Sequence, residues 1–268
     1  MLEIISHEFI QRSLCVGILV ALCAALLGVS LVLKRFSMIG DGLSHVGFGA
    51  VGIALALNWA PMYIAVPVMI IASFFLLHLS QNSKMKGDAA IAVMSSSAIA
   101  VGITAVSFAK GTNADIDSYM FGSILSVSNA DMYVSIALSV IVLGAFVFLY
   151  NKLFVVTFDE QSAMACGVKS KQYNMMLALL AAITIVIGMR LMGTLLISGL
   201  IVFPALTSMR LFRSYRKVVI SSAVISVFCF IVGFFISYLL SAPVGASVIL
   251  MNLLLFIVAC VVGKVVYK

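Results

Sequence analysis

The sequence predicts an all-α, polytopic integral membrane protein, and three observations support this fold class. Of the 268 residues, 64% are hydrophobic and only 9% are charged. The mean hydropathy is +1.26, whereas a soluble domain is roughly 45–50% apolar and about 25% charged. Apolar stretches recur from end to end, so we expect one membrane domain over residues 1–268. Despite a net charge of +7, this composition excludes a soluble globule, a disordered segment and a nucleic-acid-binding protein.

About nine stretches are apolar enough to predict transmembrane helices, each of which needs roughly 20 such residues. The second stretch is short, and the sixth and seventh are separated only by Arg190, so eight helices are an alternative. The stretches are Ser13–Leu33, Leu43–Leu57, Met62–Leu79, Ala89–Ala109, Met132–Tyr150, Tyr173–Met189, Leu191–Met209, Val218–Leu240 and Ser247–Val262. Small residues fill the second and fourth, and because small side chains let backbones approach closely, we expect both helices in the interior.

Lysine and arginine accumulate in alternate loops, which predicts the orientation in the membrane. With the N-terminus outside, nearly all basic loop residues fall on one side, as the positive-inside rule requires. They are Lys34, Arg35, Lys84, Lys86, Lys152, Lys169, Lys171, Arg210, Arg213, Arg216, Lys217, Lys264 and Lys268. We therefore expect an external N-terminus, a cytoplasmic C-terminus and an odd number of spans.

The most informative polar segment is the stretch from Lys34 to His45. Asp41 and His45 are four residues apart, so on a helix they lie one turn above the other, with Ser44 beside them. An ionisable pair entering a membrane helix indicates a functional site, and oxygen plus nitrogen donors suit Zn²⁺, Mn²⁺ or Fe²⁺. The alternative is that Asp41 caps the helix and His45 bonds a neighbouring carbonyl.

Acidic residues lie in the predicted external segment between the fourth and fifth stretches. Asp115 and Asp117 would raise the local concentration of cations at an entrance to a pathway. Alternatively, both are ordinary turn residues, and Asp131 is the N-cap of the next helix.

Two segments on the basic side are candidates for docking a partner. Thr157 to Glu160 fits a capping box that opens a short helix, which Gly167 would close. The second segment ends the seventh stretch as an amphipathic extension with apolar and basic side chains, or alternatively as an ordinary membrane-surface anchor. Its side chains are Arg210, Leu211, Phe212, Arg213, Tyr215 and Arg216.

Several ordered motifs resemble the membrane permease subunit of the zinc/manganese family of ABC importers, a resemblance that runs from about Phe9 to Val262. They are Leu33-Lys-Arg-Phe-Ser-Met-Ile-Gly-Asp-Gly-Leu-Ser-His45-Val, Gly87-Asp-Ala-Ala-Ile-Ala, Asp117-Ser-Tyr-Met-Phe-Gly-Ser-Ile-Leu125, Phe158-Asp-Glu-Gln-Ser-Ala with Gly167-Val, and Met192-Gly-Thr-Leu-Leu-Ile-Ser-Gly-Leu-Ile-Val-Phe-Pro-Ala205. The Ser-His-Val-Gly-Phe-Gly stretch favours a zinc-type member, with manganese next.

The resemblance implies a type II ABC importer-like permease in a bacterial cytoplasmic membrane. It implies a second copy of the chain, cytoplasmic ATP-binding subunits and an extracytoplasmic metal-binding protein as partners. Asp41 and His45 match the family's metal residues, and the ATPase-coupling helix would lie in Ala205–Arg216. No cofactor is expected to stay bound, because the divalent metal (zinc, or manganese or iron) is the cargo.

The missing motifs favour a transport subunit over an enzyme. The chain contains no G-x-x-x-x-G-K-[ST], so we expect ATP hydrolysis by a partner rather than by this chain. The alternative function is a stand-alone secondary cation transporter or channel, which needs the same intramembrane ligands and no partner.

Overall fold

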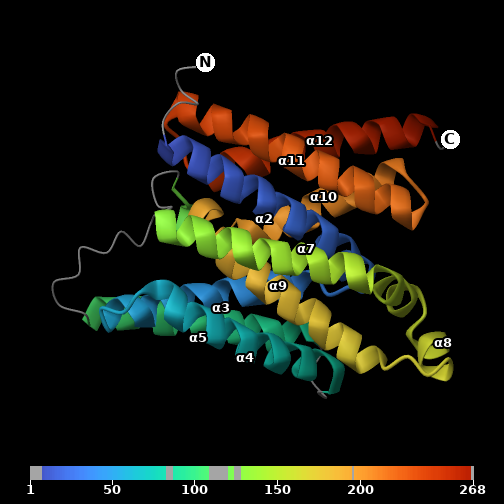
Figure 1. Ribbon diagram of the computed structural model, residues 1–268, viewed down its shortest axis with the longest axis horizontal. Coiled ribbons are helices and arrows are strands. Elements are labelled where there is room, and N and C mark those ends of the chain that lie inside the picture. Colours follow the sequence, from blue (N-terminus) through green and yellow to red (C-terminus); the bar gives the residue numbers. More distant parts are fainter. Residues whose placement is uncertain (1–7, 83–86, 109–119, 124–127, 195, 267–268) are drawn as a thin grey trace.

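The computed structural model describes residues 8–82, 87–108, 120–123, 128–194 and 196–266. Those residues form a bundle of long helices and contain no strand (Figure 1), which confirms the all-α membrane fold. The helices are α2 (Glu8–Leu33), α3 (Ser37–Ala56), α4 (Pro61–Asn82), α5 (Gly87–Phe108), α7 (Asn129–Phe158), α8 (Glu160–Ala165), α9 (Ser170–Met192), α10 (Ile197–Leu211), α11 (Tyr215–Leu240) and α12 (Val244–Val266).

Whether the sixth and seventh apolar stretches form one helix or two depends on where the chain leaves the helical conformation between them. Gly193 follows α9 with a φ of 82°, a left-handed conformation that glycine adopts without strain, and α10 begins at Ile197. Within the described residues, eight helices are long and apolar enough to span a membrane, and α10 is a shorter apolar helix of 15 residues. The two stretches beside Arg190 are therefore separate helices.

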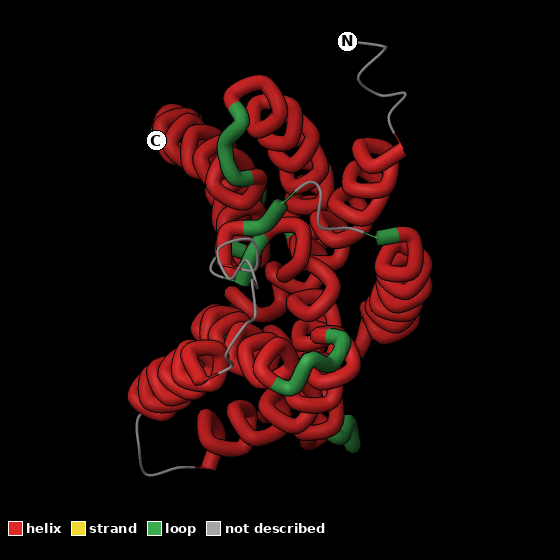
Figure 2. Tube along the Cα trace, turned by 90° about the vertical axis from the view of Figure 1, so that its left-hand side faces the viewer, coloured by secondary structure: helices red, strands yellow, loops and turns green. Residues whose placement is uncertain are grey.

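The helices run roughly parallel, as the end-on view shows (Figure 2). In Figure 1, α10, α11 and α12 form one side of the bundle, α3, α4 and α5 form the other, and α2, α7 and α9 lie between them. The helix α2 begins at the left of this view, and α12 ends at the right. The described chain therefore begins at one end of the bundle and finishes at the other.

The two helices rich in small residues differ in burial. In the apolar stretch of α3, 72% of the residues are buried, as expected for an interior helix. In α5 only 17% are buried, so the expectation that α5 is an interior helix is wrong for this single chain. A Cβ on Gly52 would lie 2.6 Å from the Gly102 carbonyl oxygen, so these two backbones touch. The small residues of α5 thus allow one face of this helix to pack closely on α3, while the side chains of Val93 and Val101 on other faces are exposed.

Candidate functional site

Asp41 and His45 lie one turn apart on α3, as the sequence predicts. Asp41 Oδ2 is 3.6 Å from His45 Nε2; the Asp41 side chain is 42% exposed and the His45 side chain is 16% exposed. At 3.6 Å the two groups are too far apart for a hydrogen bond, so both retain lone pairs for a ligand. The described structure gives His45 Nδ1, which is buried, no hydrogen-bond partner.

The geometry excludes the alternative in which Asp41 is a helix cap. The N-cap of α3 is Phe36, which makes no side-chain capping bond, and Asp41 lies beyond the first turn. His45 turns Nε2 toward the carboxylate rather than toward a backbone carbonyl. Asp41 and His45 therefore lie on the surface of α3 and neither residue caps the helix.

Ser198 is a third polar group at this site, and sequence reasoning missed it. Its Oγ donates a hydrogen bond of 3.2 Å to Asp41 Oδ1. The carboxylate is therefore approached by Ser198 on one oxygen and by His45 on the other. The residues are 157 positions apart, so no local spacing could reveal the contact.

The early start of α10 places Ser198 beside Asp41. A helix of 15 residues is about 22 Å long, which is less than the roughly 30 Å of the bilayer core. Its first turn lies inside the protein, since Ile197 and Leu200 are fully buried. The positive end of a helix favours a carboxylate nearby, and interrupted helices often border transport sites.

Of the other predicted pathway residues, Ser44 is described, and its hydroxyl does not add a ligand to this group. Ser44 is buried and donates its hydroxyl to its own helix, at the Asp41 carbonyl oxygen, 2.7 Å away. Asp115 and Asp117 lie outside the described residues. Within the described part of the chain, no group of three His, Cys, Asp or Glu side chains could hold a metal ion. One chain therefore offers a carboxylate, an imidazole and a hydroxyl.

Asp131 acts differently from the prediction that it is an N-cap. Ser128 is the N-cap of α7, and Asp131 is the third helical residue of a capping box, accepting from the Ser128 backbone N–H. The Asp131 carboxylate also pairs with Arg190, which lies in the last turn of α9 rather than in a loop. Asp131 thus joins the ends of two helices, because its carboxylate can satisfy a cap and a cation together.

At the opposite end of the bundle, the short helix α8 forms as predicted, but with a different cap. Asp159 is the N-cap and accepts from the Ser162 backbone N–H at 2.9 Å, while Thr157 still belongs to α7. The Ser162 hydrogen bonds lower the pKa of the exposed Asp159 carboxyl, because they stabilise its charged form. Gly167, with a φ of 80°, follows α8 as expected.

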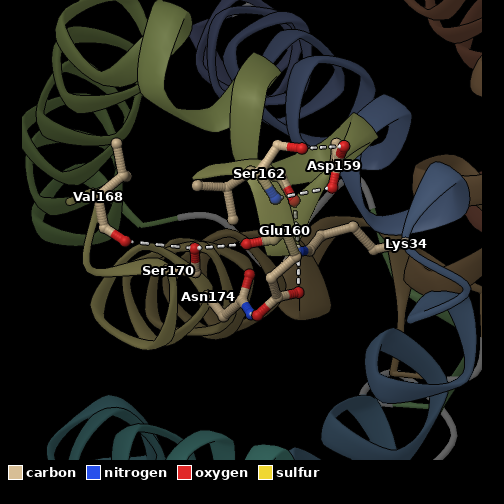
Figure 3. A network of polar contacts seen from close by, with 8 residues as sticks. Lys34, Asp159, Glu160, Ser162, Val168, Ser170 and Asn174 are labelled. Carbon is tan, nitrogen blue, oxygen red and sulfur yellow. Dashed lines mark hydrogen bonds and ion pairs between the residues drawn. The ribbon is translucent and has the colours of Figure 1, made fainter. Parts of the chain in front are cut away.

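Polar contacts hold α8 against the bundle (Figure 3). Glu160 Oε2 accepts from Lys34 Nζ at 3.0 Å, and Glu160 Oε1 accepts from Asn174 Nδ2 at 2.9 Å. Lys34 Nζ also donates to the Val156 carbonyl oxygen at 2.9 Å. Lys34, in the turn after α2, therefore bonds α7 at the Val156 carbonyl and α8 at the Glu160 carboxylate, and that same carboxylate also bonds α9 at Asn174.

The second predicted docking segment is not one amphipathic helix. Helix α10 ends at Leu211, Phe212 is extended, and α11 begins at Tyr215. Phe212 is 37% exposed, and Arg210, Arg213 and Arg216 are exposed as well.

Tyr215 does not belong to the exposed part of this segment, contrary to the sequence prediction. It is buried, it lies within hydrogen-bond distance (3.0 Å) of the Ser30 hydroxyl, and its ring packs on Tyr150, Phe154 and Phe158. The aromatic residues of α7 cover its ring, so its visible role is to pack α11 against α7 and α2.

Comparisons with known proteins agree with this architecture along the whole chain. The family model described as "ABC 3 transport family" matches residues 6–263. The manganese import system permease protein ScaB of Streptococcus gordonii is 30% identical over 252 residues, covering 94% of this chain and 90% of that protein. A probable iron transport system membrane protein of Haemophilus influenzae is 30% identical over 274 residues, covering 99% and 97%.

A solved structure shares the fold. The structure titled PsaBC from Streptococcus pneumoniae in complex with Fab has a TM-score of 0.85 and 27% sequence identity, and the match covers 95% of this chain and 91% of that one. The match therefore extends over nearly the full length of both chains. The chain therefore belongs to the ABC 3 transport family, and it is a membrane permease of the metal ABC transporter type.

Proposed function

We propose that this chain is the permease subunit of an ABC importer that moves a divalent transition metal into the cytoplasm. The observation that carries the proposal is the incompletely bonded Asp41–His45 pair with Ser198, placed at the buried start of a short helix. Charged groups inside a membrane bundle are costly unless they are paired or solvated, and a charge left incompletely bonded there indicates a ligand site or a pathway. The exposed Asp41 carboxylate meets that description, because it is not enclosed by its own chain.

A second copy of the chain completes the site in this proposal. Two strong donors are too few for a closed tetrahedral metal site, and two chains related by a two-fold axis near Asp41 supply four. Incomplete coordination within each chain also suits transport, since an ion must leave as readily as it enters. The homodimer thus follows from the donor count together with the exposure of Asp41.

For the cargo, we place manganese ahead of zinc, although the sequence motifs favour zinc. Carboxylate and hydroxyl oxygens suit Mn²⁺, while the imidazole also accepts Zn²⁺ or Fe²⁺. Two similar proteins have names that refer to manganese and iron transport systems, respectively. A competition assay in which each unlabelled metal displaces radioactive manganese from transport ranks the three ions.

The basic end of the bundle is the cytoplasmic end in this proposal. Lys34, Lys169 and the arginines after α10 lie there, as the positive-inside rule requires for a cytoplasmic face. The ATP-binding subunits would contact the exposed face of α8 and Phe212, since both project from that end. The opposite end, where Asp131 meets Arg190, would face the extracytoplasmic metal-binding protein.

In the proposed mechanism, metal enters between two copies and is held briefly by Asp41 and His45. Ser198 holds the carboxylate in place, and the ion replaces the weak contact between the carboxylate and the imidazole. ATP binding and hydrolysis by the partner subunits then change the relation of the two copies and release the ion inward.

Transport by purified components tests the proposal against a stand-alone transporter or channel. Proteoliposomes that contain the chain with ATPase subunits and the metal-binding protein should accumulate Mn²⁺ only when ATP is present on the ATPase side. Proteoliposomes that contain the chain alone serve as the matched control. Equal uptake by the chain alone, without nucleotide, would show that the secondary transporter or channel is the correct function.

A further inference from the structure

Lys34 is a lysine buried at the end of the bundle, and it has two close acceptors. Its side chain is 5% exposed, and Nζ lies 2.9 Å from the Val156 carbonyl oxygen and 3.0 Å from Glu160 Oε2. The ring of Phe36 is also near, with its centroid 5.8 Å from Nζ. A buried ammonium costs free energy unless it is paired in this way. Lys34 is therefore fixed in place by its acceptors.

Glu160 extends this contact to a third long helix. Its other carboxylate oxygen accepts from Asn174 Nδ2 at 2.9 Å, and Asn174 is 2% exposed in α9. Figure 3 shows Lys34 and Asn174 approaching Glu160 from different elements. The first residue of α8 is thus connected on one side to the turn after α2 and on the other side to α9.

The turn that holds Lys34 leads directly into the metal-site helix. Only Lys34, Arg35 and Phe36 separate α2 from α3, and Arg35 has a φ of 59° in the left-handed region. Asp41 lies four residues after the first residue of α3, which is about 6 Å along the axis. So short a connection leaves little slack, and a displacement of Lys34 reaches the start of α3.

The outer face of α8 is available to a partner. This six-residue helix buries Ala163 against the bundle, whereas Gln161 and Met164 are exposed, with Met164 at 55%. A helix this short has few contacts to hold it, so the ion pair of Glu160 is a large part of its attachment. A force applied to the exposed face would therefore be carried through Glu160.

We propose that the Lys34–Glu160 ion pair, braced by Asn174, is a strut that makes α8 and the start of α3 move as one unit. In the transport cycle, a displacement of α8 by the ATPase subunit reaches Asp41 and His45 through this strut. This inference rests on the proposed function, since it assigns a route by which ATP hydrolysis acts on the metal site. Lys34 and Glu160 are positioning residues, because neither one contacts the metal site itself.

The test compares variants in proteoliposomes that contain the complete transporter. Lys34→Met removes the charge but keeps an unbranched side chain, whereas Lys34→Arg keeps a donor for both acceptors. The matched control is Lys152→Met, an exposed lysine of α7 near the same end. Three quantities are measured: ATP hydrolysed per Mn²⁺ transported, Mn²⁺ binding to the detergent-solubilised permease, and the melting temperature.

The strut predicts that Lys34→Met raises the ATP hydrolysed per ion at least fivefold, while Mn²⁺ affinity stays within twofold of wild type. Lys34→Arg should restore most of the coupling, and Lys152→Met should leave it unchanged. If the Lys34→Met variant does not assemble, Glu160→Gln tests the same ion pair by the same ratio of ATP hydrolysed to Mn²⁺ transported. In that variant Lys34 keeps its hydrogen bond to the Val156 carbonyl oxygen, so the buried ammonium still has an acceptor. A wild-type ratio in a folded Lys34→Met or Glu160→Gln variant overturns the strut. ATP-independent uptake by the wild-type chain alone would instead overturn the proposed function, so the two failures can be distinguished.

Discussion

Two polar regions of this bundle contain charged side chains, and they differ in how completely those charges are bonded. Around Lys34, contacts of 2.9–3.0 Å join the ammonium to Val156 and Glu160. Around Asp41, the nearest polar groups are 3.2 Å and 3.6 Å away, and 42% of the aspartate side chain is exposed. In the first region the ammonium is buried and both oxygens of the 40% exposed Glu160 side chain are bonded, while in the second the carboxylate and the imidazole retain capacity for a ligand.

The comparison separates charges that hold the fold from charges that can serve a cargo. A saturated pair such as Lys34–Glu160 gains nothing from an added cation. An unsaturated carboxylate beside an imidazole gains bonding when a divalent metal arrives. The Asp131–Arg190 pair also belongs with the charges that hold the fold, because the Asp131 carboxylate is bonded by both Arg190 and Ser128 and both side chains of the pair are largely buried. The predictions below test this division, from the largest expected effect to the smallest.

Replacing Asp41 should have the largest effect on transport. Asp41→Asn keeps the shape of the side chain and its contact with Ser198 but removes the charge, so Mn²⁺ uptake should fall on the order of 100-fold. The melting temperature should stay unchanged, because the side chain is half exposed. Radioactive uptake measures the loss, and Glu8→Gln, at an exposed carboxylate in the first turn of α2, is the control. Uptake within twofold of wild type would remove Asp41 from the pathway.

Breaking the Asp131–Arg190 pair should instead affect stability. Arg190→Met leaves the partner carboxylate unpaired between α7 and α9, which should lower the free energy of unfolding by about 3 kcal/mol. Thermal unfolding in detergent measures this change, and metal binding by the folded fraction should match wild type. A large loss of metal binding at unchanged stability would show instead that this ion pair serves the cargo rather than the fold.

Removing the Ser198 hydroxyl should have a moderate effect on transport. Ser198→Ala removes one hydrogen bond that holds the Asp41 carboxylate in place, so the KM for Mn²⁺ should rise by about fivefold while kcat is retained. Ser221→Ala is the control, since that hydroxyl bonds only to its own helix at Val218. Equal KM values for the two variants would show that Ser198 has no role at the metal site.

The smallest effect is expected from the pH dependence of α8. The folded pKa of Asp159 is lowered by its bonds to Ser162, so its capping contribution is complete above the unfolded pKa. That contribution is lost as the pH falls through the lower folded pKa. Hydrogen exchange in α8 should therefore increase in strong acid relative to α9, and Asp159→Ala should abolish this extra increase. An identical acid response in both proteins would exclude the cap as its cause.

Some features of the site could be predicted because they depend on neighbouring residues in the sequence. The spacing of Asp41 and His45 requires only a helix, and so does the closing glycine after α8. The pairs Arg190–Asp131 and Lys34–Glu160 could not be predicted, since their members are 59 and 126 positions apart. The sequence places Tyr215 in a docking segment because it lies among basic residues, and only the packing of α7 shows that its ring is covered.

The sequence by itself determined that this chain is a bundle of membrane helices, where those helices lie, and that a carboxylate and an imidazole share one helical face. Hydropathy and helical periodicity act over a few turns, so these features are visible without the fold. The tertiary structure decided that α10 starts inside the bundle with Ser198 at Asp41, and that α8 is attached through Lys34. Such contacts join segments far apart in the chain, and they exist only after the helices have packed.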